Sequence, residues 1–148
     1  MSKYFMDVNI PMYSAGKPHK YKEPCSNILN YIRMGFLDIA IDTEIIQEIL
    51  YRYHNIGLAK KGIELSGYLL ALKLTILPVT HEDIILALKC YEKYYTKGVK
   101  PRDTIHVAVM INNNINTIIS TDKHFDLIEN IERIDPIEFE IFLKNTYR

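Results

Sequence analysis

The sequence predicts an α/β fold, with a central parallel sheet of about four to five strands and helices on both faces. The first observation is that predicted strands and helices alternate along the chain. Short apolar runs of strand length are followed by stretches whose apolar residues recur at the helical period. The second is composition: 148 residues, 48% apolar and 24% charged, without repeats, low-complexity tracts or linkers, fit a single domain over residues 1–148.

The first half of the chain begins with a strand and a loop. We expect a strand at 4–6 that stops at Asp7, a loop over 10–24, a helix at 26–34, a strand at 37–41, and helices at 44–53 and 58–72. The loop is predicted because it holds most of the turn formers and shows no helical period. Gly35 ends the first helix, and the last two helices form a pair because no strand separates them.

The second half continues the alternation. We expect a strand at 74–79, a helix from Thr80 to about residue 96, a helix at 103–112, strands at 117–120 and 131–134, and a terminal helix from 136 to about 144. Thr80 and Asp83 have the spacing of a capping box. Pro101 suits a first helical position, and Asp135 with Pro136 has the pattern of an N-cap followed by a first-turn proline.

Four acidic residues far apart in the chain each lie where an apolar run ends or within a helix that follows: Asp7, Glu48, Asp103 and Asp122. In a parallel sheet the carboxyl ends of the strands and the starts of the next helices line one crevice, so these carboxylates should converge. Two carboxylates 4 Å apart repel by about 4 kcal/mol at an effective dielectric near 20. Protons or a divalent cation must neutralise such a pocket, and the sequence therefore predicts a metal site.

Asp7 and Glu48 also have ordinary structural interpretations, whereas Asp103 is harder to explain without a ligand. Asp7 alone fits a turn or cap at a strand end. Glu48 is preferred over Glu44 because Glu44 points away from the apolar side of its helix, although an exposed pair of Glu48 with Arg52 remains an alternative. Asp103 opens a helix that is apolar on every side, which indicates a buried helix and a carboxylate held in the interior.

Nearby histidine and basic residues have two interpretations. His106 lies one turn after Asp103, but a buried, hydrogen-bonded histidine is preferred to a metal ligand because hard cations favour oxygen. A further group carries positive charge beside the predicted crevice. A solvated surface is the usual explanation for such a group, and its position beside the crevice also suits phosphate contacts. Its members are Lys17, Lys20, Lys22 and Arg102.

The order of the motifs FMDVN, IIQEIL, RDTIHVAVM and IISTDKHFD resembles the PIN domain family, and especially the VapC-type toxin ribonucleases, over the full chain. The resemblance implies a PIN-like fold and a metal-dependent endoribonuclease that uses Mg²⁺ or Mn²⁺. It implies that Asp7, Glu48, Asp103 and Asp122 bind the metal and are catalytic. Supporting roles are expected for Thr121, Asp126 and Asn9.

The same resemblance implies an RNA substrate, products with 5′-phosphate and 3′-hydroxyl ends, and an antitoxin protein as partner. Two alternatives stay open: a catalytically idle PIN-like module that binds RNA or protein, and a PIN nuclease of RNA maturation. A homodimer is expected, since the tyrosines at helical spacing favour core or dimer packing over base stacking.

Charge and cysteine content bear on how the protein could bind nucleic acid and on its cellular location. Eighteen basic residues balance eighteen acidic ones, so any contact with nucleic acid must come from a local patch. Cys25 and Cys90 lack neighbours at zinc spacing and are expected to be reduced thiols. No signal peptide or membrane span is expected, and the sequence predicts a cytoplasmic protein.

Overall fold

The computed structural model describes residues 3–147 and shows a five-stranded sheet in the order β3-β2-β1-β4-β5. Every neighbouring pair of strands is parallel. The strands are β1 (Tyr4–Met6), β2 (Ile39–Asp42), β3 (Thr75–Leu77), β4 (Thr117–Ile119) and β5 (Glu132–Ile134). The predicted α/β fold with a parallel sheet is confirmed.

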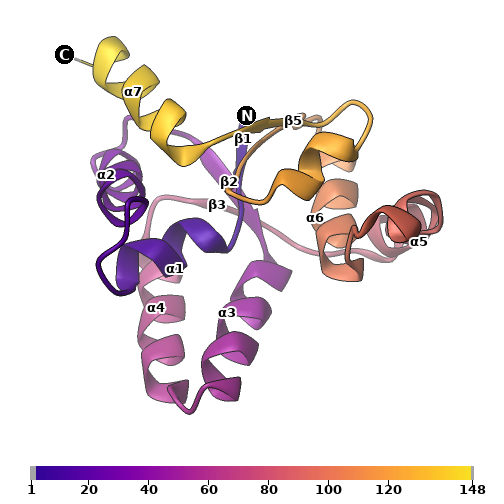
Figure 1. Ribbon diagram of the computed structural model, residues 1–148, viewed down its shortest axis with the longest axis horizontal. Coiled ribbons are helices and arrows are strands. Elements are labelled where there is room, and N and C mark those ends of the chain that lie inside the picture. The colour runs from indigo at the N-terminus through magenta and orange to yellow at the C-terminus, as the bar shows by residue number, and fades with distance from the viewer. Residues whose placement is uncertain (1–2, 148) are drawn as a thin grey trace.

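Helices cover both faces of this sheet, as predicted. They are α1 (Asn9–Ala15), α2 (Lys22–Arg33), α3 (Thr43–Asn55), α4 (Ala59–Ala71), α5 (His81–Tyr94), α6 (Pro101–Asn112) and α7 (Pro136–Thr146), with 3₁₀ turns η1 (Tyr95–Lys97) and η2 (Lys123–Leu127). Figure 1 shows α1, α2 and α7 on one side of the sheet, and α5 and α6 on the other. The paired helices α3 and α4 project from one end. No helix within residues 3–147 is long and apolar enough to cross a membrane.

The strand order places one crevice at the middle of the sheet. From β1 the chain builds outward to β2 and β3, and then returns to add β4 and β5 on the other side. Ligands bind at such reversal points, beside the carboxyl ends of the strands. Asp7 directly follows β1, Asp42 ends β2, and Asp122 lies shortly after β4, so the topology brings these acids to one edge.

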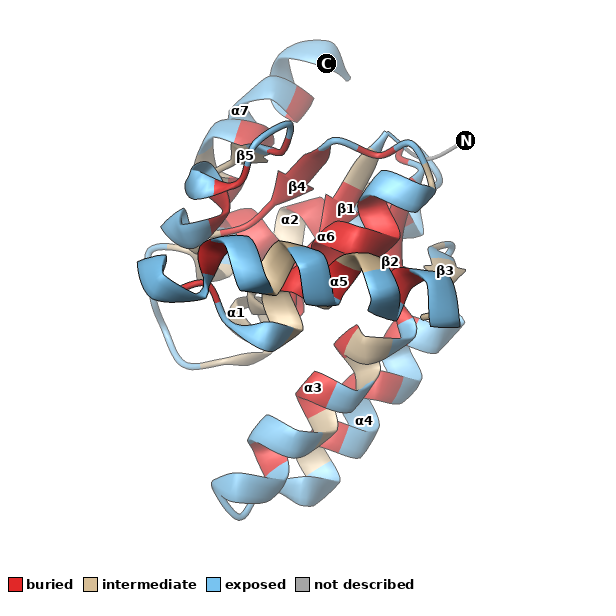
Figure 2. Cartoon of the chain, turned by 90° about the vertical axis from the view of Figure 1, so that its right-hand side faces the viewer, coloured by how far each residue is buried: buried red, intermediate tan, exposed pale blue. Residues whose placement is uncertain are grey.

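The core runs through the central strands and α6, and Figure 2 shows this buried zone between the exposed outer faces of the helices. Phe5, Ile41 and Ile118 are completely buried. Each contributes about 1.5–3 kcal/mol relative to an exposed position. In α6, the run from Val107 to Met110 is buried, as predicted. The helix is not buried on every side, because Ile111 at its end is 43% exposed.

The predicted loop over 10–24 is wrong, because residues 9–15 form α1 and α2 already begins at Lys22. Pro11 is the third residue of α1, where the backbone N–H has no partner within a helix, so proline is tolerated. Ile10 and Pro11 are buried, and α1 packs on α2. Tertiary packing therefore stabilises a short helix whose sequence lacks a helical pattern.

The predicted helix caps are confirmed. Thr80 Oγ1 accepts from the Asp83 N–H at 3.2 Å while Asp83 Oδ2 accepts from the Thr80 N–H at 2.8 Å. Asp135 Oδ1 accepts from the Ile137 N–H at 2.9 Å. These bonds satisfy backbone donors that the first turn of a helix leaves free.

Candidate metal centre

Asp7 lies buried at the end of β1 with both of its carboxylate oxygens engaged. Its Oδ1 accepts from the Val8 N–H at 2.8 Å, and its Oδ2 accepts from the Ser120 hydroxyl at 2.6 Å and the Asn9 amide at 3.1 Å. Burial raises the pKa of Asp7 to about 6, although the charge of His106 and the Ser120 hydroxyl both act to lower it. A cation beside this carboxylate would offset the cost of burying its charge.

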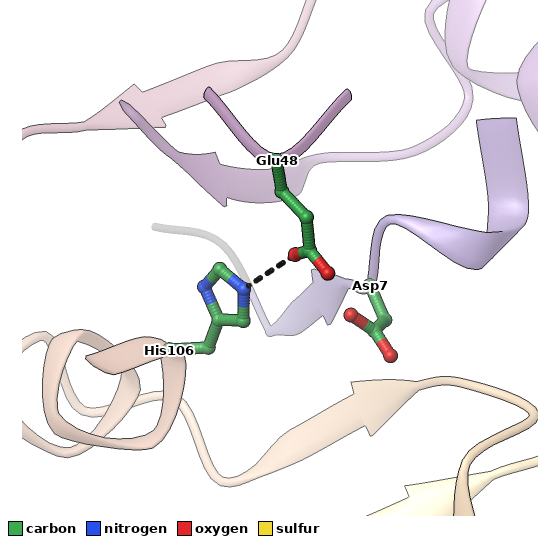
Figure 3. A group of neighbouring side chains, drawn as sticks. All are labelled: Asp7, Glu48 and His106. Carbon is green, nitrogen blue, oxygen red and sulfur yellow. Dashed lines mark hydrogen bonds and ion pairs between the residues drawn. The ribbon is translucent and has the colours of Figure 1, made fainter. Parts of the chain in front are cut away.

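Glu48 reaches the same place from α3. Its side chain is buried, with Oε2 accepting from Arg52 Nη2 at 2.8 Å and Oε1 lying 3.3 Å from His106 Nε2. Figure 3 shows Glu48 between His106 and Asp7. Burial acts to raise the pKa of Glu48, but the hydrogen bonds and charges of His106 and Arg52 outweigh it and hold the pKa below its usual value. The preference for Glu48 over Glu44 is consistent with this placement.

His106 is completely buried, as expected, and joins two acids. Its Nδ1 donates to Asp42 Oδ2 at 2.7 Å while Nε2 faces Glu48. Burial acts to lower the pKa of His106, but the charges and hydrogen bonds of Asp42 and Glu48, together with the charge of Asp7, raise it to about 10. These acids favour the protonated ring, whose contact with Glu48 Oε1 orients that carboxylate.

Sequence reasoning missed Asp42. This residue is completely buried at the end of β2, and its Oδ1 also accepts from the Ile45 N–H at 3.0 Å to cap α3. The rule that singled out Asp7, an acid directly after an apolar strand, would also have found Asp42. Its pairing with His106 joins residues 64 positions apart and had no local signal.

Asp103 and Asp122 lie at the rim, outside the group formed by Asp7, Glu48 and His106. Asp103 was expected in the interior, but the first turn of α6 leaves it only half-buried. Its Oδ2 accepts from the Lys100 N–H at 3.2 Å. Burial raises the pKa of Asp103, and repulsion from Asp122 and Glu48 raises it further, so these carboxylates act on one another. Asp122 is also half-buried, and its Oδ1 accepts from the backbone N–H and ring Nδ1 of His124 at 2.9 and 2.7 Å.

These side chains fit a hard divalent cation. Polar atoms of Asp7, Glu48 and His106 all lie within 4.8 Å of one another. Both ring nitrogens of His106 face carboxylates, so the ligand atoms left for a cation are the oxygens of Asp7 and Glu48. Repulsion links Asp103 to Glu48 and to Asp122, so negative charge extends from the buried cluster to the rim. Carboxylate oxygens are the ligands that Mg²⁺ and Mn²⁺ prefer, and His106 together with Arg52 is too little positive charge for the five acids Asp7, Asp42, Glu48, Asp103 and Asp122.

The expected supporting residues lie in different places. Asn9 bridges Asp7 Oδ2 and Ser120 Oγ, at 3.1 and 3.2 Å. The hydroxyl that bonds Asp7 belongs to Ser120, which sequence reasoning passed over, whereas Thr121 donates its backbone N–H to Asn9 Oδ1 at 3.4 Å. Asp126 instead forms an ion pair with Arg133 at 3.0 Å. Among the described residues, Asp126 makes no hydrogen bond or ion pair with the cluster, so its supporting role stays a prediction.

Three of the four basic residues predicted to contact phosphates have intramolecular contacts in the structure. Lys22 Nζ donates to the Gly16 carbonyl at 2.5 Å, and Lys20 Nζ lies 5.2 Å from the centre of the Tyr21 ring. Arg102 pairs with Glu44 at 3.1 Å. The side chain of Lys17 is exposed on the loop between α1 and α2.

Asp7 makes the stability of the metal-free protein depend on pH. Its pKa is about 6 in the folded protein against 3.8 for the ordinary group, so its contribution to stability is complete below about pH 4 and is lost as pH rises through about 6. The expected loss is about 3 kcal/mol. Chemical denaturation in chelator should show similar stabilities of wild type and Asp7→Asn near pH 4, and wild type becoming less stable than the variant as pH rises through about 6. A constant difference would mean that Asp7 is not perturbed.

Comparisons with known proteins identify the family of this chain. Residues 4–131 match the model of the PIN domain family. The chain is 30% identical over 129 residues to ribonuclease VapC13 of Mycobacterium tuberculosis, covering 87% of this chain and 97% of that protein.

Two solved structures share the fold. VapBC of Salmonella typhimurium, crystallised with DNA, has a TM-score of 0.71 and 16% identity over 92% of this chain and 99% of its own. VapC20 of Mycobacterium tuberculosis is described as a toxin that cleaves the sarcin-ricin loop. It has a TM-score of 0.71 and 10% identity, and the match covers 84% of this chain and 93% of VapC20. The match of residues 4–131 to the family model and the 30% identity to ribonuclease VapC13 confirm the expected family, and the chain belongs to the PIN domain family.

Proposed function

We propose that this protein is an endoribonuclease that depends on Mg²⁺ or Mn²⁺ and serves as the toxin subunit of a VapBC-type pair. The observation that carries the proposal is the buried meeting of Asp7 and Glu48 at the carboxyl edge of the sheet, with Asp103 coupled to Glu48. Relatives of this family that carry the name ribonuclease support the activity. In this account Asp7, Glu48, Asp103 and Asp122 are the metal-binding and catalytic residues.

Neighbouring side chains orient the two carboxylates. Ser120 and Asn9 hold Asp7, while His106 and Arg52 hold Glu48, and this ordering supports the proposal. A bound divalent cation lowers the pKa of an attacking water and stabilises charge on the scissile phosphate. Attack by water leaves a 5′-phosphate and a 3′-hydroxyl, the product ends expected for the family.

A cleavage assay separates the nuclease from the alternative of an idle binding module. Purified protein should cut RNA in Mg²⁺ or Mn²⁺ and stop when chelator is added. Absence of cleavage across a panel of structured and single-stranded RNAs, with metal loading verified, would favour the idle module. A substrate confined to precursor RNAs would instead favour the RNA-maturation alternative.

Metal binding should also stabilise the fold. A ligand that binds only the folded state adds about 2.7 kcal/mol at one hundred times its dissociation constant. For a chain of this size that corresponds to a rise in melting temperature of roughly 5–10 °C. Thermal unfolding with saturating Mn²⁺ should show the rise, and matched ionic strength in NaCl should not. Equal melting temperatures in the two salts would argue against the metal site.

The remaining parts of the proposal concern partners. An antitoxin is proposed as the protein partner because structures with this fold include toxin–antitoxin complexes. Residues 1–148 are proposed to act as one PIN-like domain, and a homodimer stays a prediction. Contacts between RNA phosphates and the four basic side chains named above also stay a prediction.

A further inference from the structure

A cavity of about 420 Å³ opens beside the carboxylate cluster, between α1, the loop at 16–21 and α3. Pockets of roughly 300–1,000 Å³ are typical of sites for small ligands. We call this cavity the α1 pocket. The residues on its wall that matter here are Asn9, Met12, Tyr13, Lys17, His19 and Arg52.

The α1 pocket is continuous with the candidate metal centre. Asn9, on its wall, donates to Asp7 Oδ2 at 3.1 Å. Arg52, also on its wall, donates to Glu48 Oε2 at 2.8 Å. A group bound in the pocket therefore lies one side chain away from two of the acids, which is the separation expected between neighbouring parts of one substrate.

Two aromatic rings, those of Tyr13 and His19, line the pocket. The rings of Tyr13 and His19 stack with centroids 4.8 Å apart and an interplanar angle of 28°. His19 Nδ1 accepts from the Tyr21 N–H at 3.1 Å, and the Tyr21 ring stacks on His19 from 5.6 Å at 21°. The His19 side chain is exposed yet held in place, so stacking a further ring against this wall would cost little conformational entropy.

Positive charge lies beside these rings. Lys17 is exposed on the wall. The Arg52 side chain is 50% exposed even though it bonds Glu48, so part of the guanidinium faces solvent. Apolar and aromatic walls next to two cations match a nucleotide, which has a flat base and an anionic phosphate.

We propose that the α1 pocket holds one unstacked base of an RNA strand next to the scissile phosphate. Tyr13 and His19 stack with the base, while Lys17 and Arg52 meet the adjoining phosphate. This inference rests on the proposed ribonuclease function and adds where the flanking nucleotide binds. It assigns to the pocket a share of substrate selection, because a base must leave its helix before it can enter.

The test measures RNA affinity with and without the base. All proteins carry Asp103→Asn so that RNA is not cut, and a short labelled single-stranded RNA spanning a mapped cleavage site is titrated by fluorescence anisotropy. His19→Ala should weaken binding roughly 5- to 150-fold, the usual effect of losing one stacked base. His81→Ala, an exposed histidine on α5, is the matched control and should bind as the parent does. Equal melting temperatures of the two variants show that both are folded.

A second pair of measurements identifies the base itself. An abasic nucleotide beside the cleavage site should weaken binding to the parent by the same factor, but should weaken binding to His19→Ala little further. Lys17→Gln should lower the salt slope of binding by about 0.7, the value for one phosphate contact on single-stranded nucleic acid.

Two results would overturn the pocket proposal. One is His19→Ala affinity equal to that of His81→Ala, and the other is an abasic penalty as large in His19→Ala as in the parent. The wild-type protein distinguishes this from failure of the proposed function. If it cleaves RNA in Mn²⁺ while either result holds, only the pocket is wrong, whereas absence of cleavage removes the function on which the pocket rests.

Discussion

Asp103→Asn is expected to lower RNA cleavage at least about 100-fold, because loss of a residue that merely supports a metal ligand already costs roughly 10- to 100-fold. Without metal the variant should be as stable as wild type or more stable. The substitution removes repulsion between Asp103 and both Asp122 and Glu48, and the new amide oxygen can still accept the Lys100 N–H. Single-turnover cleavage in Mg²⁺ and thermal unfolding in chelator measure the two effects.

Glu138→Gln is the matched control for this variant. Glu138 is the third residue of α7 after Pro136, as Asp103 is the third residue of α6 after Pro101, but its side chain is exposed on the other side of the sheet. It should retain wild-type turnover. Wild-type turnover of Asp103→Asn itself would show that Asp103 is not catalytic and that the site assignment is wrong.

His106→Ala is expected to destabilise the fold by about 3–5 kcal/mol, the usual cost of removing one partner of a buried ion pair. Asp42 and Glu48 would both remain buried without the imidazolium that now joins them. Total stabilities of single domains are only about 5–15 kcal/mol, so the loss would bring the variant close to unfolding. His106→Gln, which keeps a hydrogen-bonding side chain of similar size, provides a second variant if the first does not fold.

The destabilisation has a pH signature. The pKa of His106 is about 10 in the folded protein and 6.5 for the ordinary group, so its stabilisation is complete below about pH 6.5 and is lost as pH rises through about 10. The difference between wild type and His106→Ala in chemical denaturation should shrink accordingly. His124→Ala is the control, since His124 also pairs with an acid, Asp122, but is exposed, and it should cost about 1 kcal/mol or less. Equal costs for the two histidines would show that burial of the first pair is unimportant.

The parts of the fold that sequence predicts are those with local signals. Strand-length apolar runs and helical periodicity located the five strands and the long helices, and capping patterns such as Thr80 with Asp83 marked where helices begin. The short helix α1 had no such signal. Its seven residues include Pro11 and are stabilised by packing against α2, a contact that only the folded chain contains.

The site divides in the same way. Asp7 and Glu48 were predictable because strand ends and a helical wheel indicate which acids face inward. The partners that hold them were not, since Ser120 bonds Asp7 across 113 positions and His106 meets Glu48 across 58. Burial of His106 was predictable from its apolar helix. Its contact with Asp42 was not, because the two residues are 64 positions apart and meet only in the folded sheet.

The central claim is that the carboxylate cluster binds the divalent cation that RNA cleavage requires. The most direct test measures Mn²⁺ binding by calorimetry and single-turnover cleavage of one RNA over the same range of Mn²⁺ concentrations. We predict that binding and cleavage reach half-saturation at the same concentration, and that Asp103→Asn weakens both. Full cleavage in the presence of excess chelator, or Mn²⁺ binding and cleavage in Asp103→Asn equal to those of wild type, would contradict the claim.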